Sequence, residues 1–346
     1  MSMGGNVLTL AGDGNFSFSN TITSSAGASI TKNGSGTLFF PNNNTSKNVG
    51  NIALNGGIYE QGHQNANSGN TITAANGTKL YLNNISYSNA GVNVSSNATV
   101  TLQGTGGGDR RWTNYTFNDG SITNFEANGG TGTAIFTTNG DIALNGNVTI
   151  NATTADVNFG SKKLVGGVSL TKTGDGKLTL GTGASATYTG VTFIKGGIMV
   201  LARSGGTLAD AGAVTVDGGT LTLNQSDTVA AVTLKNGTID GVGTLTGSSY
   251  AVESGSVSAI LAGTSIALSK TTSGAVTLSG INTYTGATTV SAGTLAINGN
   301  LAAATGAVSV SGNGTRLIGN NGTIGGNTTI NSGAIHSPGG GDCKYG

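Results

Sequence analysis

The sequence predicts an all-β chain that coils into a parallel β-solenoid, and three observations carry this prediction. Short runs of alternating apolar and polar residues recur along the chain, and a period of two is typical of strands with one buried face. Glycine is abundant, with 62 among 346 residues, and Asn-Gly, Asp-Gly and Gly-Gly pairs that favour tight turns separate the runs. A segment of about 30 residues also recurs, which indicates a repeat architecture.

Composition excludes several classes of protein. Fifteen basic and 14 acidic residues leave a net charge of +1, so no nucleic-acid partner is predicted. The chain has neither an apolar run of about 18 residues nor a recognisable signal peptide, so we predict no membrane-spanning segment in it. The single cysteine, Cys343, cannot build a disulfide framework; an exposed thiol is the simpler interpretation, and a disulfide between two molecules is the alternative.

The N-terminal part, residues 1–159, is predicted to form less regular solenoid coils. It holds the first copy of the repeat at 31–60, which aligns without gaps to residues 171–200. It also holds an insertion at 106–120, GGGDRRWTNYTFNDG, whose aromatic and arginine content differs from its surroundings.

The second part, residues 160–338, is predicted to be a regular strand-repeat solenoid. A third copy of the repeat lies at 269–297, and Lys32, Lys172 and Lys270 occupy equivalent places in the three copies. Residues 339–346 form a Gly-rich tail. At 20 to 25 residues per coil, the chain would make roughly 15 coils.

The segment GAVTLSGINTYTGATTVSAGTL at 274–295 resembles the autotransporter-associated β-strand repeats of bacterial surface passengers, and residues 312–339 are similar to the rungs that follow such repeats. This resemblance implies a right-handed parallel β-helix, extracellular or displayed on a bacterial cell surface. It implies a rigid rod that acts as passenger, stalk or adhesin. The family has no common catalytic residue set, so the resemblance supplies no catalytic residues. We predict no enzyme and no cofactor. No metal site is predicted either, because the two histidines, His63 and His336, lie far apart in the sequence with no Cys, Asp or Glu at ligand spacing beside them.

A contact site for a host or cell-surface glycan or protein is predicted at the insertion, on Arg110, Arg111, Trp112 and Tyr115. Trp112 is the only tryptophan, and tryptophan and arginine are common anchors of binding surfaces. The structural alternative is that Trp112, Tyr115 and Phe117 fill a wider rung.

Three other functions stay open at the level of sequence. A filament subunit could self-associate through the solenoid ends, because the last strands of a solenoid offer unpaired edges. A carbohydrate-active enzyme would need two carboxyl groups close together, and Asp109 and Asp119 beside the insertion are the best candidates. Paired outward threonines resemble ice-binding solenoids, but their spacing is irregular.

Overall fold

The computed structural model describes residues 2–41, 49–62, 69–82, 88, 90–104, 108–127, 134–160, 162–181, 188–338 and 344–345. The described chain is all-β, and its parallel strands stack into the turns of a β-solenoid, about 14 in all. The predicted fold class is therefore confirmed. Among these residues no helix is long and apolar enough to cross a membrane.

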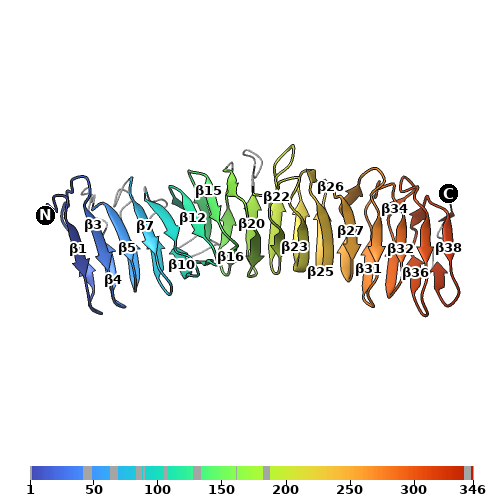
Figure 1. Ribbon diagram of the computed structural model, residues 1–346, viewed down its shortest axis with the longest axis horizontal. Coiled ribbons are helices and arrows are strands. Elements are labelled where there is room, and N and C mark those ends of the chain that lie inside the picture. The colour runs from blue at the N-terminus through green and yellow to red at the C-terminus, as the bar shows by residue number, and fades with distance from the viewer. Residues whose placement is uncertain are drawn as a thin grey trace. The chain divides into compact units, whose positions relative to one another are not determined.

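The chain divides into two compact units, residues 1–179 and 180–346. The first unit consists of three rows of stacked parallel strands (Figure 1). The first row is β1 (Val7–Leu10), β3 (Ser29–Lys32), β5 (Asn51–Leu54), β7 (Thr71–Ala74), β9 (Gly91–Val94), β12 (Tyr115–Asn118), β15 (Ile142–Asn145) and β18 (Leu164–Gly166). The second row is β2 (Phe16–Ser17), β4 (Thr37–Phe40), β6 (Ile58–Gln61), β8 (Lys79–Leu82), β10 (Thr99–Gly104), β13 (Ile122–Ala127), β16 (Val148–Ala152) and β19 (Leu170–Thr173). The third row is β11 (Gly108–Trp112), β14 (Ala134–Thr138), β17 (Asp156–Asn158) and β20 (Lys177–Leu180).

The second unit is built in the same way. One row is β21 (Thr192–Ile194), the first half of β23 (Val214–Leu223), the first half of β25 (Ala231–Gly241), β27 (Ser249–Val252), β30 (Leu268–Lys270), β32 (Thr288–Val290), β35 (Val308–Val310) and β38 (Thr328–Ile330). Another is β22 (Ile198–Leu201), the second halves of β23 and β25, β28 (Gly255–Val257), β31 (Ala275–Leu278), β33 (Thr294–Ile297), β36 (Arg316–Gly319) and β39 (Ile335–Pro338). Two shorter rows are β24 (Asp227–Thr228) with β26 (Thr244–Thr246) and β29 (Ile260–Ala262), and β34 (Asn300–Leu301) with β37 (Thr323–Ile324) and β40 (Lys344–Tyr345).

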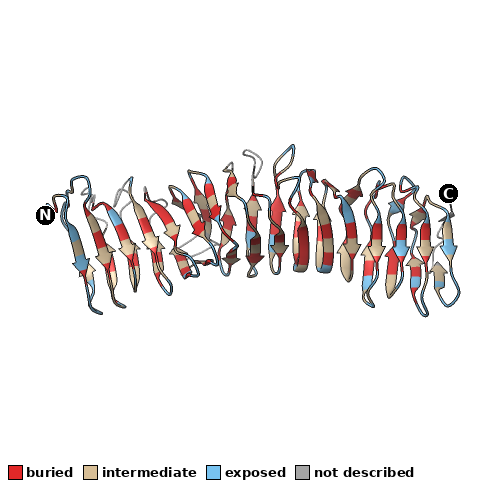
Figure 2. Cartoon of the chain, in the orientation of Figure 1, coloured by how far each residue is buried: buried red, intermediate tan, exposed pale blue. Residues whose placement is uncertain are grey.

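Most described strands bury every second residue, so apolar side chains stack in columns from rung to rung (Figure 2). In the first row of the first unit, the buried column is Ile30, Ile52, Ile72, Val92, Tyr115, Ile142 and Leu164. Equivalent residues are 20 apart from Ile52 to Ile72 and 27 apart from Tyr115 to Ile142. In the second unit, Val214 and Val232 are only 18 apart.

The rungs of the first unit change from two described strands to three at the aromatic insertion. The third row begins at β11, which lies within residues 106–120. After this point, strands that match in the repeat alignment lie in different rows: β3, in the first repeat copy, pairs with β5 in the first row, whereas β19, in the second copy, pairs with β16 in the second row. The sequence alignment identifies the repeats, but the extra strand changes the row that each one joins.

Polar side chains at the corners connect successive rungs of the first unit. A side-chain oxygen in one rung accepts a backbone N–H in the next, as from Thr37 to Asn15 Oδ1 at 2.8 Å. Amide side chains also form a ladder, in which Asn118 donates to Asn93 at 2.7 Å and Asn145 donates to Asn118 at 3.0 Å. Because the strands are short, many backbone groups lie at corners outside the strand ladders. These side-chain bonds supply hydrogen-bond partners for such groups.

The sequence predicts a boundary between residues 159 and 160, where the repeats become regular. The two compact units meet between residues 179 and 180 instead. The predicted boundary concerns repeat regularity and stays a prediction. Most of the predicted Gly-rich tail, including Cys343, lies outside the described residues, although Lys344 and Tyr345 form β40.

Candidate functional site

The aromatic insertion, where the sequence predicts a contact site, places its rings inside the first unit. Trp112 at the end of β11 and Tyr115 at the start of β12 are both 0% exposed. The Tyr115 ring stacks on Phe117 with centroids 5.6 Å apart, and its hydroxyl donates to the Thr137 carbonyl at 3.2 Å. Burial raises the pKa of Tyr115 well above its usual value. Neither ring can therefore stack on a sugar without a rearrangement of the core.

The rings fill the space that the third strand adds to each rung. Phe125 lies edge-on to Tyr115 at 6.2 Å and edge-on to Phe136 at 5.2 Å, while Phe159 approaches Tyr115 at 5.9 Å. A rung with three strands encloses a wider core, and aromatic rings fill such a volume with few side chains. This arrangement agrees with the structural alternative from the sequence.

The two arginines of the insertion differ in exposure. Arg110 is only 7% exposed, and its side chain passes over Gly104, where a Cβ atom would lie 2.7 Å from Arg110 Cγ. Arg111 is half-buried, and its Nε donates to Thr137 Oγ1 at 3.3 Å. Of the four predicted contact residues, Arg111 is the one with substantial surface, so a partner contact there stays a prediction.

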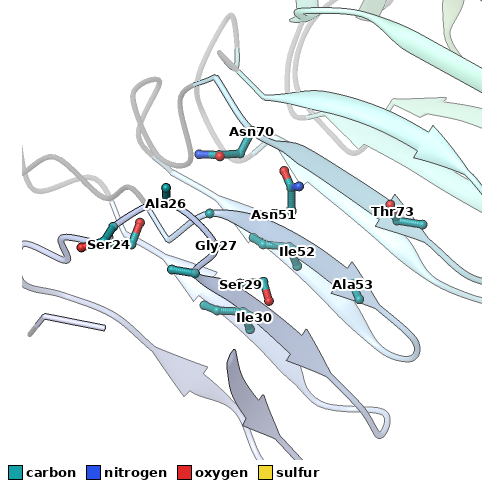
Figure 3. A pocket seen from close by; sticks show the side chains of 13 residues that line it. Ser24, Ala26, Gly27, Ser29, Ile30, Asn51, Ile52, Ala53, Asn70 and Thr73 are labelled. Carbon is teal, nitrogen blue, oxygen red and sulfur yellow. The ribbon is translucent and has the colours of Figure 1, made fainter. Parts of the chain in front are cut away.

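A groove of about 560 Å³ lies over the outer face of β3, β5 and β7 (Figure 3). It is lined by residues 24–30, residues 50–53, Asn70 and Thr73, none of them charged. Its hydroxyl and amide groups are partly used within the fold, because Asn51 Oδ1 accepts the N–H of Thr71 at 3.0 Å. The groove has the chemistry to hydrogen-bond a neutral ligand. Sequence reasoning missed it because serine, glycine and asparagine at turns are unremarkable in this chain.

A pocket of about 330 Å³ in the second unit contains the carboxylate of Asp227. This side chain is 3% exposed, and its Oδ2 accepts the N–H groups of Thr207 at 3.0 Å and Leu208 at 2.9 Å. Burial raises the pKa of Asp227, although these bonds and one from the N–H of Thr228 oppose the change. The carboxylate therefore holds the loop that follows β22 against β24.

Each repeat copy contains one buried lysine: Lys32, Lys172 and Lys270 are all 0% exposed. Lys32 Nζ donates to the carbonyls of Asn33 at 2.7 Å and Gly34 at 3.0 Å, just after the end of β3. An ammonium group can donate three hydrogen bonds. The lysine therefore binds the corner carbonyls from inside the solenoid.

Lys172 has the same arrangement, donating to Thr173 O at 2.7 Å and Gly174 O at 2.9 Å. Its pKa falls to about 8 because burial disfavours the charged form, while Asp175 and Asp156 oppose the shift.

Lys270 adds a connection between rungs. Its Nζ bonds to the carbonyl and, at 3.2 Å, to the hydroxyl of Thr272, and it reaches the carbonyl of Ala292 in the next rung, also at 3.2 Å. Burial lowers the pKa of Lys270, and Glu253 opposes this. The three lysines thus form a structural site that repeats with the motif.

Of the two acidic candidates for catalysis, Asp109 and Asp119, the structure describes the side chain of Asp119 alone. Asp119 Oδ1 accepts the N–H of Asn147 at 2.8 Å, which is the inter-rung bond seen at other corners. The side chain of Asp109 and the whole of His63 lie outside the described residues, and His336 is half-buried on β39. The described side chains include no group of three His, Cys, Asp or Glu that could hold a metal ion.

A comparison with known protein families matches three segments of the chain, and each segment contains one of the three buried lysines. Residues 30–58, 170–201 and 268–297 match the family described as Passenger-associated-transport-repeat. No curated protein matches the chain, and no solved structure does.

The stacked rungs make the protein a β-solenoid repeat protein. Its three passenger-associated transport repeats then match it to an autotransporter passenger with β-helix repeats, as the sequence resemblance implies.

The buried lysines are the feature that sequence reasoning missed, although the signal was present. In the strand Ser29–Lys32, Ile30 and Lys32 are two residues apart and therefore lie on the same face. Since Ile30 is in the core, Lys32 points inward as well. This alternation, together with the alignment of Lys32, Lys172 and Lys270 in the three copies, is the signal that identifies one buried lysine in each repeat.

Proposed function

We propose that the protein is a non-catalytic extracellular structural scaffold of a bacterium, acting as a passenger, stalk or adhesin that is secreted or displayed on the cell surface. The observation that carries this proposal is the threefold match to the passenger-associated transport repeat within a solenoid. Each matched copy builds four strands and contains one lysine that binds a corner from inside. The repeat is thus a construction unit of the scaffold.

The surface chemistry supports a role outside the cell. Only 8% of residues are charged and the net charge is +1, so stability comes from the apolar column, the backbone ladder and the polar corners. These interactions depend little on ionic strength, since salt screens mainly exposed charge pairs. A scaffold of this kind suits an environment whose salt concentration changes.

Antibodies raised against the purified protein test the proposal on intact cells of the source organism. We expect labelling of unbroken cells, or recovery of the protein from the medium, and loss of the surface signal after external protease treatment. A cytoplasmic enzyme followed in the same samples reports lysis. Labelling that appears only after lysis would overturn the proposal.

A further inference from the structure

Outward-facing side chains on five neighbouring strands of the first unit line up in one lane. The strand registers place Phe39 of β4 beside Glu60 of β6, Glu60 beside Tyr81 of β8, Tyr81 beside Gln103 of β10, and Gln103 beside Glu126 of β13. All five are half-buried, whereas the residues that alternate with them point into the core. We call this set the aromatic–acid lane.

The two aromatic rings of the lane are two rungs apart. Adjacent strands of a sheet are separated by about 4.8 Å, so Phe39 and Tyr81 are separated by about 9.6 Å, close to the span of two β-linked sugar residues in an extended chain. A sugar chain running across the strands would therefore present an equivalent ring face to each aromatic side chain. Phenyl and phenol rings offer flat apolar platforms for such faces.

Polar groups fill the intervening places in the lane. Glu60 lies between the two rings, where its carboxylate can accept hydrogen bonds from sugar hydroxyls. Beyond Tyr81, Gln103 Nε2 donates to Glu126 Oε2 at 3.2 Å, which fixes the orientation of both side chains. The lane contains two carboxylates, and Lys79 lies on the same strand as Tyr81. This balance disfavours a polyanion.

Two other outward lanes, one in each unit, lack this pattern in their described residues. On the first row of the same unit, the corresponding lane is Thr31, Ala53, Thr73, Asn93 and Thr116. In the second unit, the outward Phe193 is followed by Thr215 and Thr233, so no ring lies two rungs away. Among these three described lanes, the alternation of ring, acid and ring belongs to the aromatic–acid lane alone.

We propose that the aromatic–acid lane binds an extended, uncharged β-linked polysaccharide that runs along the solenoid axis, with sugar faces on Phe39 and Tyr81 and a hydroxyl on Glu60. The site goes beyond the scaffold role, and cell-surface labelling and glycan binding can succeed or fail separately.

Isothermal titration of the full chain with cellohexaose, xylohexaose and chitohexaose tests the proposal, with a hexamer of β-1,4-linked mannuronic acid as the anionic comparison. We expect binding of at least one neutral hexamer and at least tenfold weaker binding of the acidic one. Phe39→Ala and Tyr81→Ala should each weaken binding about tenfold, the loss typical of truncating an anchor residue. The matched control is Phe193→Ala, which removes an outward ring whose lane holds threonines in the next two rungs, and it should leave affinity unchanged.

A variant that moves one ring tests the spacing itself. Tyr81→Thr combined with Gln103→Tyr keeps two rings but places them three rungs apart, and it should bind as weakly as Tyr81→Ala. Circular dichroism and thermal unfolding confirm that each variant is folded. Absence of binding to all three neutral hexamers, equal affinity of the Phe39→Ala variant, or recovery of affinity in the shifted variant would each overturn the proposal.

Discussion

Replacing Lys172 by methionine tests whether a buried lysine stabilises the corner of each repeat. Methionine keeps most of the apolar length of the side chain but cannot donate to the Thr173 and Gly174 carbonyls, which Lys172 Nζ reaches at 2.7 and 2.9 Å. Both carbonyls would then be left facing the interior without this donor. The substitution separates the hydrogen bonds of the ammonium group from the packing of its stem.

The expected loss follows from these two bonds. Hydrogen bonds that involve a charged group contribute about 1.5–3 kcal/mol each, so about 3–6 kcal/mol is removed. Burying the methionine side chain returns about 1.5–3 kcal/mol. We therefore expect Lys172→Met to lower the free energy of unfolding by about 2 kcal/mol at pH 7.

The pH dependence has a definite sign. The pKa of Lys172 is about 8 in the folded protein and 10.5 when unperturbed. Between these values the unfolded chain holds a proton that the folded protein has released, so this lysine makes the wild-type protein more stable as pH rises from 8 to 10.5. Lys172→Met lacks that increase. The difference in the free energy of unfolding between the wild type and this variant should therefore be larger at pH 10 than at pH 7.

Urea unfolding followed by circular dichroism measures the global effect, and hydrogen exchange of residues 164–180 measures the local one, because repeat proteins can unfold in parts. Lys177→Met is the control: this lysine is exposed and forms an ion pair with Asp156 at 3.5 Å, so its loss should cost less than about 1 kcal/mol. The reasoning is refuted if Lys172→Met is as stable as the wild type and exchanges no faster.

Three further predictions concern the core and the corners. Trp112→Ala, at a side chain with no exposed surface, should lower the free energy of unfolding by about 3–5 kcal/mol in urea titrations; a loss below about 1 kcal/mol would show that the ring is not packed in the core. Gly50→Ala places a Cβ 1.8 Å from a backbone oxygen at φ +77°. It should shift the urea midpoint at least twice as far as Gly77→Ala, which has φ +75° and open space, and equal shifts would contradict the clash. Tyr284→Phe removes a 2.8 Å bond to the Thr288 hydroxyl and should cost about 1–2 kcal/mol. Because burial raises the pKa of Tyr284 to about 12, the folded protein retains a proton that the unfolded chain loses above pH 10. The free energy of unfolding should therefore fall between pH 10 and 12. In Tyr284→Phe the part of this fall that comes from the Tyr284 hydroxyl should be absent.

Much of the fold was accessible from sequence. Alternation in residues 214–223 predicts that Val214, Val216, Leu221 and Leu223 share one face, and all four are buried. The lysines at 32, 172 and 270 mark the three repeats, which the family comparison matches. The candidate contact site was harder to predict, because a Trp-Arg cluster suits a surface as well as a core, and local sequence does not show how wide a rung is.

The sequence by itself determined the strand period, the turns and the repeat, since each depends on side-chain alternation and backbone freedom within a few residues. Only the tertiary structure decided which strands share a row. The third strand that begins at β11 moves later repeats to another row, buries Trp112 and Tyr115, and leaves Arg111 at the surface. Independently of β11, the register of β4, β6 and β8 brings Phe39, Glu60 and Tyr81 into one lane, although they are about twenty residues apart along the chain. The register between two rungs depends on the lengths of all the turns between them. It is therefore fixed only when each rung stacks on the previous one.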